Sequence, residues 1–504
     1  MVGYERRTMR GVASRIALLV ALAPCLAFAD AAGDRFNAGG YFRIMTRPDF
    51  EGGNGKLGYW NISGRLLNEG PWAALELGLD VLQAQPGTND VWAAVHAKLE
   101  GGSFKNTDPG NGSLTQFGLS QMYVKAGNVV LDRVTWQLGT LESYFGDLGL
   151  YDMRPASVFS DTVGLSARYQ LDRVDLLLGI GDSGYALRGA AYNTLLTAGG
   201  SVRVRVNDHL EFGGGGQYAY EPQVMGNRNA PYYTPGVTYE DTLRHEVVQH
   251  FLEENPGQED LFPKPVATSA FSYKAIGYLG FGKLGPLRWS NLFVSYRKLH
   301  PDNSYVESFG GRDYTIYLAQ LTDKRTQLLA GNEMQFTVVP GRLDAAWAVL
   351  YGKDVNPDNT VAPGDDNRTY YSTVLRLQLY LSQTVHLLAE SSLAQEKSAN
   401  GRLYREHVDS VFANSGGTPD SRGLETGDTD TRNTWQLKGG VVLNPTGLGI
   451  YMRPSLRLMY GLQYSNQQAA YGNAFVESLD QYNVFIGPER HWHSVVAIEA
   501  EGWF

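Results

Sequence analysis

The chain has 504 residues, among them 59 Gly, 30 Tyr and 20 Phe, and a formal net charge of −9 at pH 7. This negative charge argues against a nucleic-acid-binding protein. After residue 29 no run of eighteen apolar residues occurs, which argues against a helical membrane span and leaves a closed β-barrel as the structure able to cross a bilayer.

The first 29 residues have the features of a secretory signal peptide. Four Arg residues precede an apolar run over residues 16–29, which ends in small residues before Asp30. Cys25 is the only cysteine and lies inside this segment. We therefore expect an exported chain, a signal peptide over 1–29 followed by a barrel domain over 30–504, without thiol or disulfide.

Segments of about ten residues in which apolar and polar residues alternate fill the rest of the chain. This alternation is typical of transmembrane β-strands, whose successive side chains face lipid and lumen in turn. We expect such strands near residues 36–46, 58–68, 72–83, 91–99, 118–126, 134–141, 165–171, 174–182, 199–206, 209–220, 273–283, 286–298, 331–339, 343–352, 370–382, 384–395, 434–444, 449–463 and 491–504. The pattern predicts an all-β fold, a closed antiparallel transmembrane barrel of about 18 strands.

The connections fall into two classes, as expected when one end of a barrel has tight turns and the other long loops. Tight turns are predicted at 207–208, 341–342 and 382–383, and long loops at 221–272, 353–369, 396–433 and 464–490. Within the first of these loops residues 239–254 predict a short helix, which would be a lid or an ordered surface segment.

The last predicted strand, His491 to Phe504, ends on an aromatic residue at the chain terminus, as the closing strand of an outer-membrane barrel does. Trp503 is in phase with Glu499 and Glu501, so it is expected in the lumen rather than at the lipid interface. A soluble two-domain β protein would share part of the composition. It would not need an export signal together with such a strand.

No catalytic constellation is evident. The His residues are scattered, and the two local groupings, His245 with His250 and His491 with His493, are interpreted as solvated loop or strand-end residues. We find no phosphate-binding Gly loop and no metal-ligand spacing. The expectation is a protein that carries out no reaction and needs no cofactor or metal.

Several predicted strands place aromatic or Arg residues on their polar face. These residues are Tyr41 with Arg43, Arg65 with Asn61 and Ser63, Trp72 with Glu76 and Asp80, and Tyr451 with Arg453 and Arg457. A sugar ring stacks its C–H face on an aromatic ring, while its hydroxyls exchange hydrogen bonds with charged groups. Many weak contacts of this kind allow a sugar to slide through a pore. The alternative is that the aromatic residues are girdle residues or lumen filler.

Five blocks of the sequence resemble the maltoporins, trimeric eighteen-stranded outer-membrane channels for maltodextrins and related sugars. They occur in the same order as in that family and, together with Trp503, make up about a tenth of the mature chain. The blocks are residues 40–43 (GYFR), 65–69 with 72–81 (RLLNE, WAALELGLDV), 104–109 (FKNTDP), 139–155 (GTLESYFGDLGLYDMRP) and 451–457 (YMRPSLR).

The resemblance implies roles for individual residues. It places Tyr41, Trp72, Tyr451 and Trp503 on an aromatic slide, Phe104 on a loop that reaches into the neighbouring subunit, Arg43 and Arg65 on a polar track, and Asp147 and Asp152 at the constriction formed by an inward-folded third loop. One slide position on a middle strand is not matched, and Trp289 and Phe293 are candidates for it. A homotrimer is implied as well.

The sequence departs from the family at the expected constriction. Arg154 stands where the family has a Tyr, Phe145 and Ser120 stand where it has Arg, and Ala74 replaces a carboxylate. The balance of charge at the narrowest point is therefore altered, which leaves an anionic sugar, another oligosaccharide or an unrelated polar solute open. Arg154 is counted among the solute-binding candidates.

The prediction is a sugar-selective channel for facilitated diffusion in the bacterial outer membrane, with an oligosaccharide or other polar solute and membrane lipid as its partners. A general, non-selective diffusion porin is the alternative. A surface-binding protein or enzyme with its activity in 221–272 or 396–433 is a third possibility.

Overall fold

The structure is a computed structural model of the whole chain. It describes residues 35–48, 50, 57–58, 61–84, 88–102, 117–159, 162–183, 195–225, 246–254, 256, 267–299, 304–309, 312–317, 325–355, 368–398, 431–466 and 491–504. The expected signal peptide, residues 1–29, and the candidate Phe104 lie outside these ranges.

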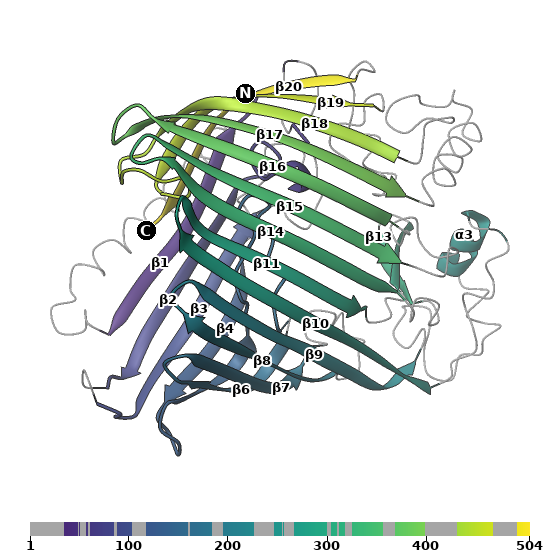
Figure 1. Ribbon diagram of the computed structural model, residues 1–504. Coiled ribbons are helices and arrows are strands. Elements are labelled where there is room, and N and C mark those ends of the chain that lie inside the picture. The colour runs from purple at the N-terminus through teal and green to yellow at the C-terminus, as the bar shows by residue number, and fades with distance from the viewer. Residues whose placement is uncertain are drawn as a thin grey trace, which may run out of the picture.

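Eighteen strands form one closed antiparallel barrel (Figure 1). They are β1 (Phe36–Thr46), β2 (Trp72–Leu82), β3 (Trp92–Gly102), β4 (Phe117–Gly127), β5 (Val134–Leu141), β6 (Thr162–Gln170), β7 (Val174–Asp182), β8 (Leu196–Asn207), β9 (Leu210–Met225), β10 (Ala267–Leu284), β11 (Leu287–Lys298), β14 (Thr326–Val339), β15 (Leu343–Val355), β16 (Arg368–Tyr380), β17 (Val385–Ser398), β18 (Thr431–Leu443), β19 (Ser455–Ser465) and β20 (Trp492–Trp503). Each strand pairs with its neighbours along the barrel, and β1 pairs with β20 to close the ring. The predicted fold is confirmed.

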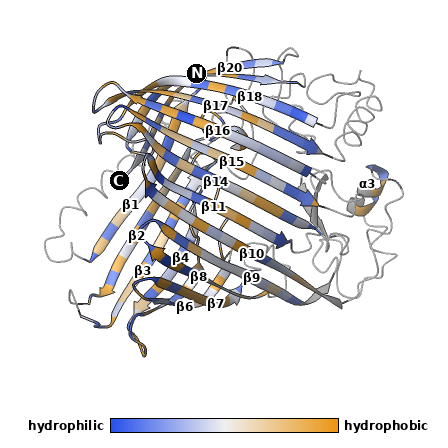
Figure 2. Cartoon of the chain, in the orientation of Figure 1, coloured by the Kyte–Doolittle hydropathy of each residue, from blue (hydrophilic) through white to orange (hydrophobic). Residues whose placement is uncertain are grey.

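The outward face of the barrel is apolar. In β16, for example, Leu375, Leu377 and Leu379 are exposed, while the residues between them, Arg376 and Gln378, are buried on the inner side. Figure 2 shows this alternation as stripes along the strands. The buried inner side is therefore the polar one, which is the reverse of a soluble protein and is typical of a barrel in lipid.

Aromatic rings gather on the outward face near the ends of strands that lead into long connections. Tyr218 packs near Phe271 with ring centroids 6.1 Å apart, and Tyr273 packs near Tyr296 at the same separation. On the far side of the seam Tyr464 lies 4.9 Å from Trp492. Such rings form the interfacial girdle of a transmembrane barrel, since they combine an apolar body with a polar tip.

Short connections lie at one end of the barrel, which we call the short-turn end. They include 128–133, 171–173, 208–209, 285–286, 340–342 and 381–384, and the chain terminus Phe504 lies at the same end. The strand ends that lead into the longer connections lie at the other end of the barrel, called the long-loop end. In outer-membrane barrels the short turns face the periplasm.

One strand prediction is wrong and another is wrong in part. The described residues of 58–68 form no strand, because the chain makes the 3-10 turn η2 (Asn61–Ser63) and then bends at Gly64 and Leu67, which have φ values of 86° and 61°. A positive φ is incompatible with an extended strand. The segment expected at 449–463 begins only at Ser455, since Pro454 has no N–H for the sheet.

The remaining elements are small. Helix α3 (Glu246–Glu254) matches the second half of the predicted helix, and β12 (Ser304–Phe309) with β13 (Arg312–Tyr317) forms a separate hairpin. The sequence did not predict this hairpin. None of the helices in the described part of the chain is long and apolar enough to cross a membrane.

Candidate functional site

Three segments fold into the barrel and cover one side of its lumen. The first, called the first inward segment, comprises the described residues 57–58 and 61–70 between β1 and β2. Its Leu57 and Leu67 are buried against Leu388 and Met459 of the barrel wall. The side chains expected to line a lipid-spanning strand here instead anchor a segment inside the barrel.

Buried polar contacts hold this first inward segment as well. Lys438 donates to the carbonyl of Ser63 at 2.9 Å and pairs with Glu390 at the same distance, and Asn68 donates to Gln436 at 3.0 Å. The whole Lys438 side chain is buried, so it needs these partners to offset the loss of water.

The second inward segment, residues 142–159 between β5 and β6, crosses the lumen and reaches the opposite wall. Tyr151 is buried, and its hydroxyl lies 2.9 Å from Ser372 of β16. Burial raises the pKa of Tyr151, so the hydroxyl stays protonated. The backbone N–H of Leu150 donates to Glu333 of β14 at 2.9 Å. The predicted inward-folded loop is confirmed.

The third inward segment is residues 444–454, between β18 and β19 at the short-turn end. Ile450 joins the same apolar cluster as Leu148 and Leu150 of the second inward segment. Tyr451 donates its hydroxyl to Glu333, and its ring lies 6.2 Å from that of Trp289. Tyr451 is thus on an inward turn and not on a strand, which corrects the expectation for residues 449–463.

These segments make the two sides of the lumen different. On the covered wall, β14–β20, charged side chains such as Glu333, Arg376 and Glu390 are at most 1% exposed. On the open wall, β2–β8, the side chain of Glu76 is 49% exposed and that of Arg168 is 46% exposed. A solute that crosses the barrel therefore has its free surface along β2–β8, except where Phe159 of the second inward segment covers β7 and β8.

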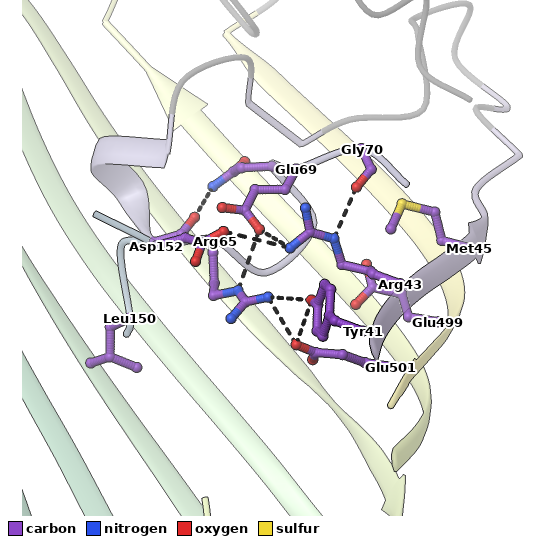
Figure 3. A network of polar contacts seen from close by, with 12 residues as sticks. Tyr41, Arg43, Met45, Arg65, Glu69, Gly70, Leu150, Asp152, Glu499 and Glu501 are labelled. Carbon is purple, nitrogen blue, oxygen red and sulfur yellow. Dashed lines mark hydrogen bonds and ion pairs between the residues drawn. The ribbon is translucent and has the colours of Figure 1, made fainter. Parts of the chain in front are cut away.

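A network of charges lies where the open and covered walls meet at the β1–β20 seam (Figure 3). Glu501 of β20 accepts hydrogen bonds from Tyr41 at 2.8 Å and Arg65 at 2.9 Å, and it pairs with Arg453 at 2.8 Å and Arg457 at 2.5 Å. One buried carboxylate thus joins β1, β19, β20 and two inward segments.

A second carboxylate of this network, Glu69, lies on the first inward segment. It pairs with Arg43 and lies 3.3 Å from Arg65, and Asp152 of the second inward segment lies 3.9 Å from Arg43. Burial raises the pKa of Glu69 to about 7, although both Arg residues act in the opposite direction. Glu69 is therefore poised to change its charge near neutral pH.

The two network arginines outside the strands are shifted in opposite directions. Burial opposes the charge on Arg65, but Glu501 and Glu69 raise its pKa well above the usual value. Burial lowers the pKa of Arg453 to about 9, and the neighbouring Arg457 adds to this effect. Arg65 is the firmly charged member of the pair.

Aromatic residues from the two ends of the chain meet beside this network. The rings of Tyr41 and Trp503 lie 4.6 Å apart with an interplanar angle of 46°, and Trp503 remains 63% exposed. Trp72 pairs across the sheet with Arg43, so it lies on the same lumen face. Three of the residues proposed for the slide are therefore neighbours.

The other candidates are distributed differently. Asp147 is exposed on the second inward segment, and burial of part of its carboxyl group raises its pKa. Arg154 pairs with Glu142 at 3.0 Å and lies over the ring of Tyr144 at 4.6 Å. Phe293 is fully buried in the apolar cluster, where no solute can reach it.

Some residues of the site were not found from the sequence. Glu69, Glu333 and Glu390 organise the inward segments, but each is a single carboxylate in a run that contains other polar residues. The sequence places Glu333 and Glu390 on the polar face of a predicted strand. This placement does not distinguish a residue that lines the path from one that is covered.

The described residues offer no metal site: no group of three His, Cys, Asp or Glu side chains lies together in a way that could hold an ion. His491 contacts the carbonyl of Ser465 at 2.9 Å, as a strand-end residue does. His245 lies outside the described ranges.

No protein-family model matches the chain. No curated protein matches it either. Solved structures of similar architecture include the outer membrane channel DcaP of Acinetobacter baumannii, with 8% identity over 93% of this chain and 97% of that one at a TM-score of 0.44. OccAB1 of the same organism has 10% identity over 93% of this chain and 96% of its own, at a TM-score of 0.44. OpdO of Pseudomonas aeruginosa has 10% identity over 94% of this chain and 97% of its own, at a TM-score of 0.39.

The membrane assignment follows from the barrel itself. Eighteen strands close without an edge, the outward face is apolar, aromatic rings lie at its border, and the charged residues face inward. Of the structures that can span a bilayer, only a closed barrel satisfies every backbone hydrogen bond with strands. The protein is an 18-stranded transmembrane β-barrel of the bacterial outer membrane.

Proposed function

We propose that the protein is a channel for facilitated diffusion of sugars and similar polyhydroxylated solutes across the outer membrane. The observation that carries the proposal is the contact of Tyr41 with Trp503 beside the Arg65–Glu501 pair on the lumen face. Aromatic rings with charge-assisted donors and acceptors beside them are the groups that a sugar ring needs.

The arrangement of charge supports a polar solute of low net charge at this place. Around the seam the guanidinium groups of Arg43, Arg65 and Arg457 are each paired with a carboxylate of Glu69 or Glu501. These pairs create no strong field for one sign of ion, and the partly exposed guanidinium of Arg65 is the group that can exchange hydrogen bonds with a hydroxyl. Asp152 and Arg154, on the second inward segment, would complete the track from the other side.

The homotrimer and the contribution of Phe104 from a neighbouring subunit are part of the same proposal and rest on the resemblance in the blocks quoted above. Tyr451 contributes less directly, because its hydroxyl is bound to Glu333 and its ring packs beside Trp289. In this proposal it supports the second inward segment.

A general diffusion porin is the second candidate. It is favoured by the burial of Phe293 and the partial burial of Tyr451, which leave a shorter aromatic row than a full slide would need. In that case the rings at the seam would be structural and the channel would show no saturation.

Conductance of the purified protein in a planar bilayer separates these functions. The current is measured while maltodextrins, other oligosaccharides and sugar acids are titrated into the bath. Saturable block by a sugar class supports the proposed channel, and current steps in threes support the trimer. Open channels that no sugar blocks would establish the general porin, and a protein without conductance would contradict both candidates.

A further inference from the structure

The open wall of the lumen carries an aromatic row of its own, apart from the seam. His96 of β3 stacks on Tyr123 of β4 with ring centroids 4.6 Å apart and an interplanar angle of 16°. Lys125, two residues further along β4, has its ammonium 4.8 Å from the centroid of the same ring. Trp92 begins β3 at the short-turn end on the same side of the sheet.

These side chains face the lumen and not the lipid. In the register of β1 to β4, Gly39 pairs with Glu76, Glu76 with Lys98, and Lys98 with Gln121, so alternate residues from these positions share the face of Tyr41. The residues that flank Tyr123 on the other face, Met122 and Val124, are exposed and apolar. The row therefore borders the solute path.

The described residues do not use the polar atoms of this row in hydrogen bonds or ion pairs. Within the described ranges neither the Lys125 ammonium, the Tyr123 hydroxyl, the His96 ring nitrogens nor the Trp92 indole N–H takes part in a hydrogen bond or ion pair. Charged groups of the covered wall, such as Lys438 and Glu390, are bound on all sides by comparison. Free donors on the open wall remain available to a solute.

Nearby carboxylates do not neutralise Lys125. Glu142 is bound by Arg154 and Gln121, and Glu76 lies 4.0 Å from Lys98. The charged group across the sheet that acts on Lys125 is Arg168, another cation.

Arg168 is less able than Lys125 to bind an incoming anion, because it already has a carboxylate partner. It is held by both carboxylate oxygens of Asp175, at 2.8 and 3.0 Å. Among the described residues of this part of the lumen, Lys125 is thus a cation without a carboxylate partner.

Two glycines pack closely against these side chains and add no side chain of their own. Gly139 of β5 pairs with Tyr123, and a Cβ there would lie 2.9 Å from that of the Tyr; its φ of 124° also favours glycine. Gly127 lies under Trp92, whose indole nitrogen would be 1.9 Å from a Cβ at that position. The neighbouring Ala94 is also small. The wall therefore presents aromatic rings beside the ammonium of Lys125.

We propose that Trp92, His96, Tyr123 and Lys125 form a second solute subsite, on the open wall near the short-turn end, that binds a pyranose carrying a carboxylate. The inference rests on the proposed sugar channel and names a solute class for it. The ring of the sugar stacks on Trp92 or on the Tyr123–His96 pair. Its carboxylate gives up hydrating water and accepts a charge-assisted hydrogen bond from the ammonium of Lys125.

The test compares an acidic and a neutral oligosaccharide in the same bilayer. At about 0.1 M salt, where charges interact over roughly 10 Å, trigalacturonate should block the wild-type channel at a lower concentration than maltotriose. Lys125→Gln should raise the half-blocking concentration of trigalacturonate roughly fivefold or more, since a charge-assisted hydrogen bond is lost, and should leave that of maltotriose unchanged. Lys298→Gln, a cation that lies over Phe271 on the outward girdle, is the control and should change neither.

The outcomes separate the two proposals. If maltotriose blocks the channel but Lys125→Gln leaves the block by trigalacturonate unchanged, the subsite is refuted and the sugar channel stands. If neither saccharide blocks the wild type, the sugar channel is refuted together with the subsite. Trp92→Ala provides a second measurement: it should weaken block by both saccharides, because ring stacking does not depend on the carboxylate.

Discussion

The ring of Tyr41, in the first strand, lies 4.6 Å from the ring of Trp503, the penultimate residue of the chain. Closure of the barrel between β1 and β20 creates this contact, because Tyr41 and Trp503 are direct partners in the sheet register. The pair adjoins Glu501, whose carboxylate joins the seam to the inward segments. The pairing of β1 with β20 that closes the barrel thus also brings the residues of the proposed site together.

The double variant Trp72→Ala with Trp503→Ala should weaken sugar binding with little change in ion current. Each ring contributes roughly 0.5–1.5 kcal/mol of stacking, so the half-blocking concentration should rise about tenfold. The measurement is sugar-dependent block in a planar bilayer. Trp347→Ala, which removes an outward-facing indole, is the matched control. An unchanged affinity in the folded double variant would refute the slide at the seam.

Glu501→Gln should destabilise the barrel. The amide keeps an acceptor for Tyr41, but it leaves Arg65, Arg453 and Arg457 without their common countercharge in a buried place. Breaking a buried network from one side costs about 3 kcal/mol or more. The measurement is the urea midpoint of the protein in lipid vesicles.

Glu142→Gln is the control for this variant, because the Arg154–Glu142 pair is partly exposed. An exposed pair contributes less than about 1 kcal/mol. Equal urea midpoints of the two variants would show that Glu501 does not stabilise the barrel more than Glu142 does.

Ion selectivity should depend on pH through Glu69. Burial raises its pKa to about 7, so the carboxyl group is neutral at pH 5 and ionised at pH 8. The lumen beside Arg43 and Arg65 therefore gains a negative charge as the pH rises, and anion selectivity should fall. Reversal potentials across a salt gradient between pH 5 and 8 measure this change.

Glu69→Gln should remove that pH-dependent component and leave selectivity at its low-pH value. The stability contribution has a defined sign as well. Since the folded state holds this proton more tightly than the unfolded state, whose carboxyl titrates near its ordinary pKa of 4.5, the contribution is complete below that pKa and is lost as the pH rises through about 7. A wild-type and a variant with the same pH profile would contradict the assignment.

Glu333→Ala should loosen the constriction. Leu150 of the second inward segment and Tyr451 of the third both donate to this carboxylate, and each loses its acceptor in the variant. The expected result is larger current fluctuation in single open channels. Tyr451→Phe removes only the bond to the third segment and should have a smaller effect. If the Glu333→Ala channel had wild-type conductance and no added current fluctuation, apolar packing of Leu148 and Leu150 would be sufficient to hold the second inward segment in place.

The sequence alone determined the barrel. Alternation with a period of two, short turns between the strands and an aromatic terminus depend on local order along the chain, and eighteen of the predicted segments coincide with barrel strands. The one segment without a counterpart, 58–68, shows the limit of that signal. Its apolar residues are also buried, but they pack against the inside of the barrel. An alternating pattern predicts that one face is covered, and it does not tell whether lipid or protein covers that face.

Only the tertiary structure decided which lumen residues a solute can reach. Tyr41, Trp503, Glu333 and Phe293 all lie on polar-face or lumen positions, yet the first two are accessible at the seam and the last two are covered by inward segments. The difference arises from contacts between residues far apart in the chain, such as Leu150 with Glu333 and Arg65 with Glu501. Local sequence sets the face on which a side chain lies, whereas packing across the barrel sets whether that face meets water.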